Sequence, residues 1–369
     1  AVRRLSFSEN GRWLAGTSED HLVWLWPVKV DHPPTALRGH RATVNEVRFA
    51  PDAIHLFTSS ADGTVRSWRS SDGRLLQTWR GHRGAVLGLV VQNVPGGLRL
   101  FSVGTDGTVR SWRPGRAEGR LVVELGTPLL LAQPGPGGSG LVVSDFAGRL
   151  HFVDPDGQVS ATIPAHQGSI YGLDLGRGSR LVTGGRDKAV RLWHAPTAAR
   201  QSQARPHGDR VTDATFADHG RVVVSTGVDH TLRIWQADRG RVLRVLRGHR
   251  DEVNGLALGP DDRTVVSAGA DHTVRLWQLP GGAPLRTLVG HREAVTDVAI
   301  APDGRTVASV SNDKTLRLWS AANGEARHRV EHPDQVSSVA FSPDGRWLAT
   351  ACVDGIRLWR WPGLRPAGR

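Results

Sequence analysis

Residues 37–79, LRGHRATVNEVRFAPDAIHLFTSSADGTVRSWRSSDGRLLQTW, contain the pattern that decides the fold. Four short runs rich in β-branched and aromatic residues, VNEVRF, HLFTSS, TVRSW and LLQTW, alternate with the turn-forming stretches PDA, ADG and SSDG. Such runs between clusters of Gly, Pro, Asp and Ser predict strands. Because the connections are this short, consecutive strands are antiparallel neighbours. The stretch therefore predicts one four-stranded sheet.

The same pattern recurs at a fixed period along the chain, as one tryptophan in each unit shows. The eight tryptophans are separated by 42, 44, 81, 42, 42, 42 and 40 residues, and the gap of 81 is two units with one tryptophan missing. At about 41 residues per unit, the 369 residues make nine units. A single sheet cannot bury both of its faces, but sheets stacked around an axis bury them on one another. The tryptophans are Trp26, Trp68, Trp112, Trp193, Trp235, Trp277, Trp319 and Trp359.

A His, a Ser or Thr, an Asp and the Trp recur together in seven units, with 21 to 24 residues between the His and the Asp. The quartets are His40, Thr58, Asp62, Trp68; His82, Ser102, Asp106, Trp112; His166, Thr183, Asp187, Trp193; His207, Ser225, Asp229, Trp235; His249, Ser267, Asp271, Trp277; His291, Ser309, Asp313, Trp319; and His332, Thr350, Asp354, Trp359. In four units a Gly precedes the quartet His and forms a GH pair with it. The quartets and these GH pairs resemble the WD-repeat β-propeller family. That resemblance implies a hydrogen-bonded chain inside each blade. The residue after the Trp is never Asp, so the dipeptide that names the family is absent.

We therefore expect an all-β fold, a single β-propeller domain over 1–369 with nine four-stranded blades. A seven-bladed ring with pieces of another module and an eight-bladed ring with 120–165 as an insert are the alternatives. The expected blades are 1–38, 39–80, 81–125, 126–164, 165–205, 206–247, 248–289, 290–330 and 331–369.

Two units are irregular. The fourth blade is degenerate, because Val143, Ala147 and Val153 take the places of the Ser/Thr, the Asp and the Trp, and we expect apolar packing alone to hold it. In the first blade Gly16 replaces the Ser/Thr, and the His would fall before residue 1.

The composition supports no catalytic, cofactor or metal site. One Ser/Thr–His–Asp set in a cleft would suggest a nucleophile, but seven copies at blade period, each with a tryptophan, indicate structural networks. The chain has no GxxxxGK[ST] loop, and its other histidines show no metal-ligand spacing. Its one cysteine, Cys352, favours a reducing compartment, so we expect a cytoplasmic protein. No run of 18 apolar residues suggests a membrane span.

The basic residues outnumber the acidic ones, 47 to 35, for a net charge of +12. A basic balance indicates nucleic-acid binding only when the charge gathers on one face. Here many arginines stand at fixed repeat positions, which spreads them around the ring, so we do not expect a nucleic-acid partner. Seven arginines lie two residues before a blade Trp: Arg66, Arg110, Arg191, Arg233, Arg275, Arg317 and Arg357.

In the family the GH loops and the loops before each Asp share one face, the top, and the resemblance implies that a protein or peptide binds there. Charged residues of this chain fall in those loops, and arginine is enriched at interfaces. The candidates are Arg41, Arg83, Arg186, Arg210, Arg250, Asp251, Arg292 and Glu293.

The resemblance implies a non-catalytic protein-interaction scaffold. Bacterial WD-repeat arrays often form the sensor or partner-recognition module of larger signalling or defence proteins, so a catalytic domain in the same longer chain is a further expectation. The alternative function is binding of a phosphate-rich ligand or nucleic acid through an arginine-rich channel rim.

The last blade must take its fourth strand from the tail or from residues before Ala1. If the tail supplies it, deleting residues 360–369 will lower the melting temperature by several degrees, because the third strand loses its partner. Thermal unfolding followed by circular dichroism measures this. An unchanged melting temperature would show that the tail does not close the last blade.

Overall fold

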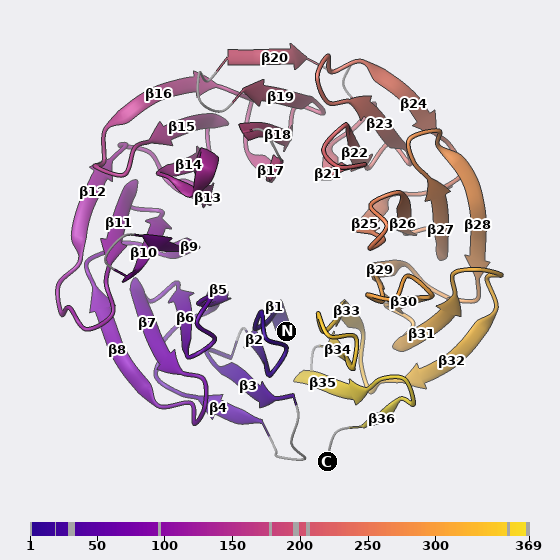
Figure 1. The fold of residues 1–369 in the computed structure, drawn as a ribbon, viewed down its shortest axis with the longest axis horizontal. Coiled ribbons are helices and arrows are strands. Elements are labelled where there is room, and N and C mark those ends of the chain that lie inside the picture. Colours follow the sequence, from indigo (N-terminus) through magenta and orange to yellow (C-terminus); the bar gives the residue numbers. More distant parts are fainter. Residues whose placement is uncertain are drawn as a thin grey trace. The chain divides into compact units, whose positions relative to one another are not determined.

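The structure, a computed structural model, is all-β and describes residues 2–18, 20–28, 34–94, 97–176, 179–194, 199–203, 207–352 and 355–366. Its thirty-six strands form nine four-stranded sheets, and in each sheet the strands lie in chain order (Figure 1). A short 3-10 turn, Pro136–Gly138, lies among them. The fold is a β-propeller of nine blades, which we number sheets 1 to 9 in chain order.

The first of two compact units comprises Ala1–Ile163, Ser342–Trp347 and Gly355–Arg369 and contains sheets 1 to 4. Their strands are, in sheet 1, β1 (Val2–Phe7), β2 (Trp13–Ser18), β3 (Val23–Pro27) and β4 (Thr35–Leu37); in sheet 2, β5 (Val44–Phe49), β6 (His55–Ser60), β7 (Thr64–Arg69) and β8 (Leu75–Arg80); in sheet 3, β9 (Val86–Val94), β10 (Gly97–Gly104), β11 (Thr108–Trp112) and β12 (Arg120–Glu124); and in sheet 4, β13 (Leu129–Pro134), β14 (Leu141–Asp145), β15 (Arg149–Val153) and β16 (Val159–Pro164).

The second unit comprises Pro164–Phe341 and Leu348–Asp354 and contains sheets 5 to 8. Their strands are, in sheet 5, β17 (Ile170–Gly176), β18 (Arg180–Gly185), β19 (Val190–His194) and β20 (Ala199–Gln203); in sheet 6, β21 (Val211–Ala217), β22 (Val222–Gly227), β23 (Leu232–Gln236) and β24 (Val242–Leu246); in sheet 7, β25 (Val253–Leu258), β26 (Thr264–Gly269), β27 (Thr273–Gln278) and β28 (Ala283–Val289); and in sheet 8, β29 (Val295–Ile300), β30 (Thr306–Ser311), β31 (Thr315–Ser320) and β32 (Ala326–Glu331). Sheet 9 has β33 (Val336–Phe341), β34 (Trp347–Cys352), β35 (Gly355–Arg360) and β36 (Arg365–Pro366).

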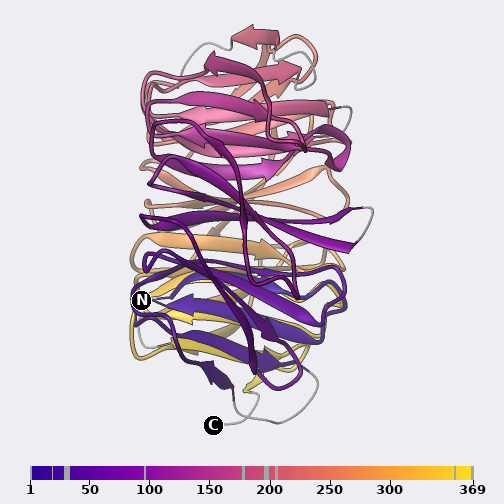
Figure 2. The same cartoon turned by 90° about the vertical axis from the view of Figure 1, so that its left-hand side faces the viewer.

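The two middle strands of each sheet are covered on both faces, as sheet 2 illustrates. All residues of β6 and β7 are buried except the first of β6 and the last of β7, whereas β8, the fourth strand, exposes half of its residues. Small and β-branched residues suit strands that are enclosed on both sides. Figure 2 shows the sheets of the first unit from the side on which β8 and β12 lie, with their twisted strands one above another. The apolar core therefore lies between consecutive sheets.

The blade tryptophan fills that core by packing against the preceding sheet. Trp68 of sheet 2 belongs to one buried cluster with Leu25 and Leu37 of sheet 1. Trp277 of sheet 7 belongs to another with Val224 and Ile234 of sheet 6. Burying such a side chain stabilises the fold by about 1.5–3 kcal/mol or more, so these two tryptophans couple sheets 2 and 7 to the sheets before them.

The first strands of consecutive sheets lie side by side within each unit, β1 to β13 in the first and β17 to β33 in the second. A polar side chain early in the strand often donates a hydrogen bond to the next sheet. The bonds are Asn45 Nδ2 to Val86 O (2.9 Å), Thr212 Oγ1 to Val253 O (2.8 Å), Asn254 Nδ2 to Val295 O (2.9 Å) and Thr296 Oγ1 to Val336 O (2.6 Å). These bonds add directionality to the apolar contact between sheets.

The structure confirms the prediction of nine blades. Residues 120–165 supply β12 and a complete sheet 4, so the eight-bladed alternative with an insert is wrong, and so is the seven-bladed ring. Each sheet lies inside its predicted interval, except that β32 ends at Glu331, one residue beyond 330. The single domain over 1–369 stays a prediction, because the chain divides into two compact units. In the tail, β36 pairs with β35.

Candidate functional site

A chain of hydrogen bonds joins the four side chains of the quartet in sheets 2, 3, 5, 6, 7 and 8. The indole Nε1 lies 2.8–3.0 Å from the Ser/Thr hydroxyl oxygen. That oxygen lies 2.7–2.8 Å from the imidazole Nε2. The imidazole Nδ1 lies 2.6–3.0 Å from the aspartate. The structure thus brings these residues together within each sheet.

The direction of this chain follows from what each group can do. An indole N–H only donates and a carboxylate only accepts. The hydroxyl therefore accepts from the indole and donates to Nε2, which leaves Nδ1 to donate its proton to the carboxylate. A neutral imidazole with the proton on Nδ1 satisfies every group, and a fully satisfied network rigidifies a core.

The hydroxyl of each quartet is enclosed, which distinguishes these sets from a catalytic triad. Thr58, Ser102, Ser225 and Ser309 are fully buried. Each of these hydroxyl oxygens also accepts the indole N–H, so it has no free path toward a substrate. In a triad the corresponding oxygen is open to attack a carbonyl. The arrangement can hold the sheet together, but it presents no nucleophile.

The aspartate also fixes the exposed loop that follows the histidine. In sheet 2, Asp62 Oδ2 accepts the backbone N–H of Arg41 at 2.9 Å as well as His40 Nδ1–H. In sheets 3 and 5 to 8 the quartet aspartate likewise accepts a backbone N–H at 2.6–3.1 Å; the donors are Arg83, Gln167, Gly208, Arg250 and Arg292. One carboxylate therefore connects the buried network to a loop whose side chains face solvent.

A threonine two residues after the aspartate completes this site, and the sequence analysis did not single it out. Its hydroxyl donates to the aspartate at 2.6–2.9 Å. A repeated D-x-T could have revealed it: the threonines are Thr64, Thr108, Thr231, Thr273 and Thr315. In sheet 5 alanine stands there, and Arg191 Nη1 lies 2.7 Å from Asp187 Oδ2 and 2.6 Å from His166 Nδ1 instead.

Burial and hydrogen bonds act in opposite directions on the quartets' protonation. Burial lowers the pKa of His40, although the hydrogen bond and the charge of Asp62 oppose it. For Asp313, burial alone would raise the pKa, but the bonds from Thr315 and the Arg292 N–H, with the charge and bond of His291, together lower it to about 2. The imidazole is thus kept neutral and the carboxylate ionised near neutral pH.

In the seven units that have it, the arginine two residues before the blade Trp is partly or fully buried rather than free at the surface, which explains the glycine of the GH pair. A Cβ on Gly248 would lie 2.6 Å from Arg275 Nη1, and one on Gly290 would lie 2.8 Å from Arg317 Nη1. The glycine therefore leaves room for the guanidinium. Arg317 Cζ also lies 5.9 Å from the ring centre of Trp319, a cation–π contact.

Sheets 1 and 9 contain partial sets. In sheet 9, His332 Nε2 lies 2.9 Å from Thr350 Oγ1, and Trp359 is buried. Asp354, assigned to the same quartet, lies outside the described residues. In sheet 1, Asp20 Oδ1 accepts the Leu22 N–H at 3.1 Å instead of binding a histidine.

Sheet 4 corrects the prediction that apolar packing alone holds the degenerate blade. Asp145 is fully buried, and its carboxylate accepts the backbone N–H of Arg149 at 2.8 Å and Arg149 Nε–H at 2.6 Å. His151 Nε2 lies 3.2 Å from the same carboxylate, and Thr127 Oγ1 donates to it at 3.1 Å. His151 Nδ1 in turn lies 3.0 Å from Thr162 Oγ1. A second polar network therefore replaces the quartet.

The residues of this network stand at different repeat positions. By strand register His151 pairs with Val143 as Arg66 pairs with Thr58 in sheet 2, so the histidine occupies the usual arginine position. The prediction failed because the carboxylate is not at the usual position, Ala147, but two residues earlier, at Asp145. The stretch DFAGRLH (145–151) contained the signal.

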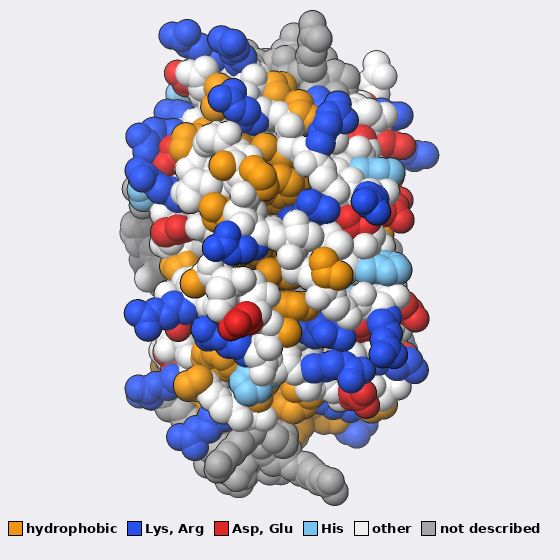
Figure 3. Space-filling view, turned by 90° about the vertical axis from the view of Figure 1, so that its right-hand side faces the viewer, with side chains coloured by type: hydrophobic (Ala, Val, Ile, Leu, Met, Phe, Trp, Pro, Cys, Tyr) orange, Lys and Arg blue, Asp and Glu red, His pale blue; other side chains and the backbone are white. Residues whose placement is uncertain are grey.

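The partner-binding candidates are exposed and lie in loops at one end of their sheets, which we call the His–Asp end. Each loop lies before a first strand or between a second and a third strand. One side-chain contact among these loops stands out: Arg210 Cζ lies 5.9 Å from the ring centre of Tyr171, which is 45% exposed. In Figure 3, Lys and Arg side chains are scattered among acidic and apolar ones on the side shown. The candidates are Arg41, Arg83, Arg186, Arg210, Arg250, Asp251, Arg292 and Glu293.

Neither a metal site nor a membrane helix is present in the part of the chain that the structure describes. No three His, Cys, Asp or Glu side chains there are placed to hold an ion. The described residues also form no apolar helix of membrane-spanning length.

The family model described as WD domain, G-beta repeat, matches eight stretches: 1–27, 32–69, 73–113, 157–194, 200–236, 240–278, 282–320 and 325–359. They leave out residues 114–156, which contain most of sheet 4 with its rearranged network.

Similar curated proteins are matched over short stretches. The transcriptional corepressor LEUNIG_HOMOLOG of Arabidopsis thaliana is 34% identical over 85 residues, which is 23% of this chain and 11% of that protein. Apoptotic protease-activating factor 1 of Rattus norvegicus is 33% identical over 93 residues, 25% of this chain and 7% of that protein. Ribosome assembly protein 4 of Saccharomyces cerevisiae is 33% identical over 63 residues, which is 17% of this chain and 12% of that protein. The matched part thus spans 7–12% of these relatives.

A solved structure is similar in fold over nearly the whole chain. The crystal structure of the computationally designed Ika8 protein covers 98% of this chain and 96% of its own, with a TM-score of 0.67 and 23% identity. At this identity the likeness extends to the fold alone.

The lowered histidine pKa values predict a loss of stability in mild acid. The folded state binds its protons more weakly than the unfolded chain, so the free energy of unfolding falls as the pH drops below 6.5, the ordinary histidine value. The aspartates add a further loss below their ordinary value of 3.8. Urea unfolding at pH 7.5 and pH 5 measures the first effect. The control is a substitution of an exposed histidine, His328→Gln, which will keep the same difference in unfolding free energy between the two pH values. Equal unfolding free energies at the two pH values would contradict the neutral buried imidazoles.

The network of sheet 4 predicts a large effect of Asp145→Asn. The change keeps the size of the side chain but leaves Arg149 and His151 without their carboxylate. We expect a loss of about 1.5–3 kcal/mol, the usual worth of a hydrogen bond to a charged group. Chemical denaturation measures it, with exposed Asp154→Asn in the same sheet as the matched control. Equal unfolding free energies for the two variants would show that apolar packing alone holds sheet 4.

Proposed function

Because the chain belongs to the WD40 family, whose repeat is described as WD domain, G-beta repeat, we propose that it is a non-catalytic protein-interaction scaffold. A protein or peptide partner binds to the exposed loops at the His–Asp end of the sheets. The observation that carries this proposal is the double role of the quartet aspartate in sheets 2, 3 and 5 to 8, which bonds the buried imidazole and the backbone of the loop.

This arrangement prepares the loops for binding before a partner arrives. The backbone of Arg41, Arg250 and Arg292 is fixed by the carboxylate, while their side chains remain exposed. A preformed loop loses less conformational entropy on binding, so more of the contact energy becomes affinity. Exposed arginines beside Asp251 and Glu293 give the surface both charge signs, which suits selective recognition of a protein.

A scaffold role also agrees with the chemistry of the quartets and with the relatives. The quartet hydroxyls are buried and accept an indole N–H. Two relatives are named for corepression and for ribosome assembly, and a third for activating a protease. We infer that partner recognition, rather than catalysis, is the role of the repeats in this chain.

We further propose that the repeats form the sensor or partner-recognition module of a larger signalling or defence protein, with a catalytic domain elsewhere in that chain. The support is that the matched stretches make up 7–12% of the relatives' lengths. A cytoplasmic location suits a chain with one cysteine, Cys352, which is buried.

Reversing the four arginines that follow the GH pairs, Arg41, Arg83, Arg250 and Arg292, to Glu will abolish partner capture. Their backbone bonds to aspartate do not involve the side chain, so the fold will remain. Affinity purification with quantitative mass spectrometry compares the variant with the wild type, and circular dichroism confirms the fold.

The matched control reverses four exposed arginines at the opposite ends of the sheets, Arg74, Arg241, Arg305 and Arg346. It carries the same change in net charge and will keep the partner. Loss of capture in both variants would indicate a general charge effect. Capture of nucleic acid with steep salt dependence would favour the phosphate-binding alternative. Retained capture in the first variant would contradict binding at the His–Asp end.

A further inference from the structure

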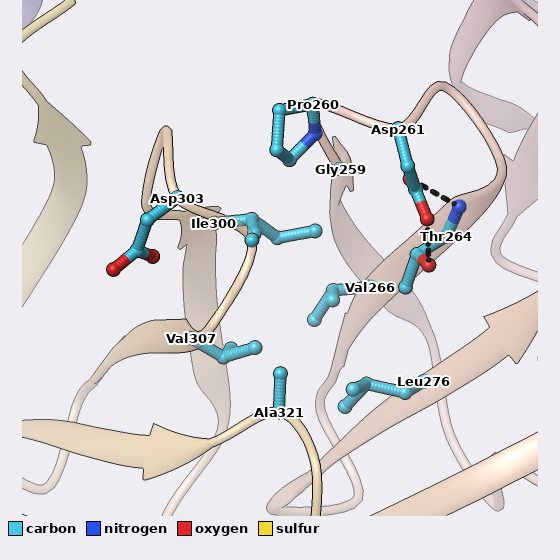
Figure 4. A pocket seen from close by; sticks show the side chains of 11 residues that line it. Gly259, Pro260, Asp261, Thr264, Val266, Leu276, Ile300, Asp303, Val307 and Ala321 are labelled. Atoms are coloured by element: carbon cyan, nitrogen blue, oxygen red, sulfur yellow. Dashed lines mark hydrogen bonds between the residues drawn. The ribbon is translucent and has the colours of Figure 1, made fainter. Parts of the chain in front are cut away.

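The junction between sheets 7 and 8 contains a pocket of about 280 Å³ (Figure 4). Its walls are the aliphatic side chains of Val266, Leu276, Ile300, Val307 and Ala321. Its mouth lies between the connections β25–β26 and β29–β30, so it opens at the end of the sheets opposite the arginine loops. It is therefore separate from the surface assigned above to the partner.

The pocket exists because two positions that fill the two preceding junctions of this unit have a smaller combined side-chain volume here. The first position is the residue of the first strand that pairs with the same second-strand residue as the blade Trp does. The second position is two residues after that Trp in the sequence. Between sheets 6 and 7 these residues are Leu258 and Leu279, and both pack in the core cluster there. Between sheets 5 and 6 they are Phe216 and Ala237.

At the junction of sheets 7 and 8 the same positions hold Ile300 and Ala321. An isoleucine with an alanine fills less space than two leucines or than a phenylalanine with an alanine. Protein interiors are close-packed, and a void loses contact energy. The unfilled space is thus a departure from the packing of the two preceding junctions of this unit.

The mouth of the pocket is acidic, in a chain with a net charge of +12. Asp261 and Asp303 belong to the lining, one from each of the two facing loops, and no Lys or Arg is among the lining residues that the structure describes. In Figure 4 the Asp303 carboxylate points outward, away from the aliphatic walls, and the Asp261 carboxylate lies beside Thr264, so both are at the rim rather than inside the pocket. Asp261 is held in place by the Arg263 and Thr264 N–H groups at 3.0 and 2.9 Å and by Thr264 Oγ1 at 2.7 Å. These bonds lower the pKa of Asp261 against the opposing effect of burial, so it is ionised.

The nearest arginine on the first loop does not neutralise this carboxylate. Arg263 Nε lies 3.7 Å from Asp218 Oδ1 of sheet 6, which draws its guanidinium toward another carboxylate. Within the described residues, the carboxylate of Asp303 accepts a single hydrogen bond, from the Arg305 backbone N–H to Oδ1 at 2.8 Å. Both carboxylates can therefore accept further donors from a bound molecule.

We propose that the sheet 7–8 pocket receives one aromatic side chain of a partner peptide whose neighbouring residue is Lys or Arg. A cavity of about 150 Å³ lined by aliphatic residues holds benzene, so a pocket of about 280 Å³ accommodates an indole ring. It is smaller than the roughly 300–1,000 Å³ that drug-sized ligands and cofactors occupy. The aliphatic walls bind the ring, and Asp261 and Asp303 bind the adjacent cation.

The test uses a short fluorescein-labelled peptide with one tryptophan between two arginines, and fluorescence anisotropy measures its binding to the whole chain. Saturable binding is expected. Replacing the tryptophan of the peptide by alanine, or its arginines by glutamates, will weaken binding about tenfold or more, because each removes one of the two contacts. A peptide that binds no better than its alanine version would overturn the proposal.

Ala321→Leu is the decisive protein variant, since it installs the residue of the neighbouring junction, Leu279, and fills the pocket. This variant will keep or raise the melting temperature of the protein and weaken its binding of the peptide about tenfold or more. If this variant does not fold, Ile300→Phe fills the same space with the residue of sheet 6. Undiminished binding by a folded, pocket-filled variant would contradict the proposal.

Asp261→Asn with Asp303→Asn isolates the contribution of charge, and exposed Glu325→Gln in sheet 8 is the control. The double variant will bind the peptide more weakly than the wild type, and the difference will be largest at low salt. The control will bind the peptide as the wild type does. The four-arginine variant at the His–Asp end will bind the peptide normally. Failure of this pocket and failure of the proposed partner surface are therefore distinguishable.

Discussion

The aspartate carboxylate of each quartet is the group on which the rest of the structure depends. In sheet 2 it accepts the imidazole proton of His40 and the backbone N–H of Arg41. Because a carboxylate only accepts and an indole only donates, the chain of bonds runs from Trp68 through Thr58 and His40 to Asp62. The same group thus determines the order of the core network and the position of an exposed loop. Packing of Trp68 against sheet 1 then connects this network to the neighbouring sheet.

Sheet 4 shows which part of this arrangement the fold requires. It lacks the tryptophan and the hydroxyl of the quartet, yet it keeps a buried carboxylate in contact with an imidazole and an arginine. The residues come from other positions, Asp145, Arg149 and His151, and the apolar Val153 replaces the indole in the core. A buried charge is costly unless it is paired and hydrogen-bonded. Sheet 4 therefore retains a satisfied carboxylate although the sequence pattern is lost.

The period and the quartets are local patterns repeated many times, so the nine sheets and their strand order could be predicted from the sequence. The packing of Arg275 over Gly248 could not, because it depends on where a half-buried guanidinium lies in three dimensions. The network around Asp145 was missed because equivalent chemistry had moved to other strand positions. The pocket beside Ala321 depends on the combined volume of side chains from two sheets, which no single repeat contains.

The central claim is that the quartets of sheets 2, 3, 6, 7 and 8 are neutral, directed chains of hydrogen bonds ending at the aspartate. Long-range ¹H–¹⁵N NMR of histidine side chains at pH 7 tests it most directly, because it distinguishes the two neutral tautomers and the imidazolium. For His40, His82 and His291 the account predicts one neutral tautomer with the proton on Nδ1 and an unprotonated Nε2 that accepts a hydroxyl. Imidazolium signals, or averaged signals from two exchanging tautomers, would contradict it.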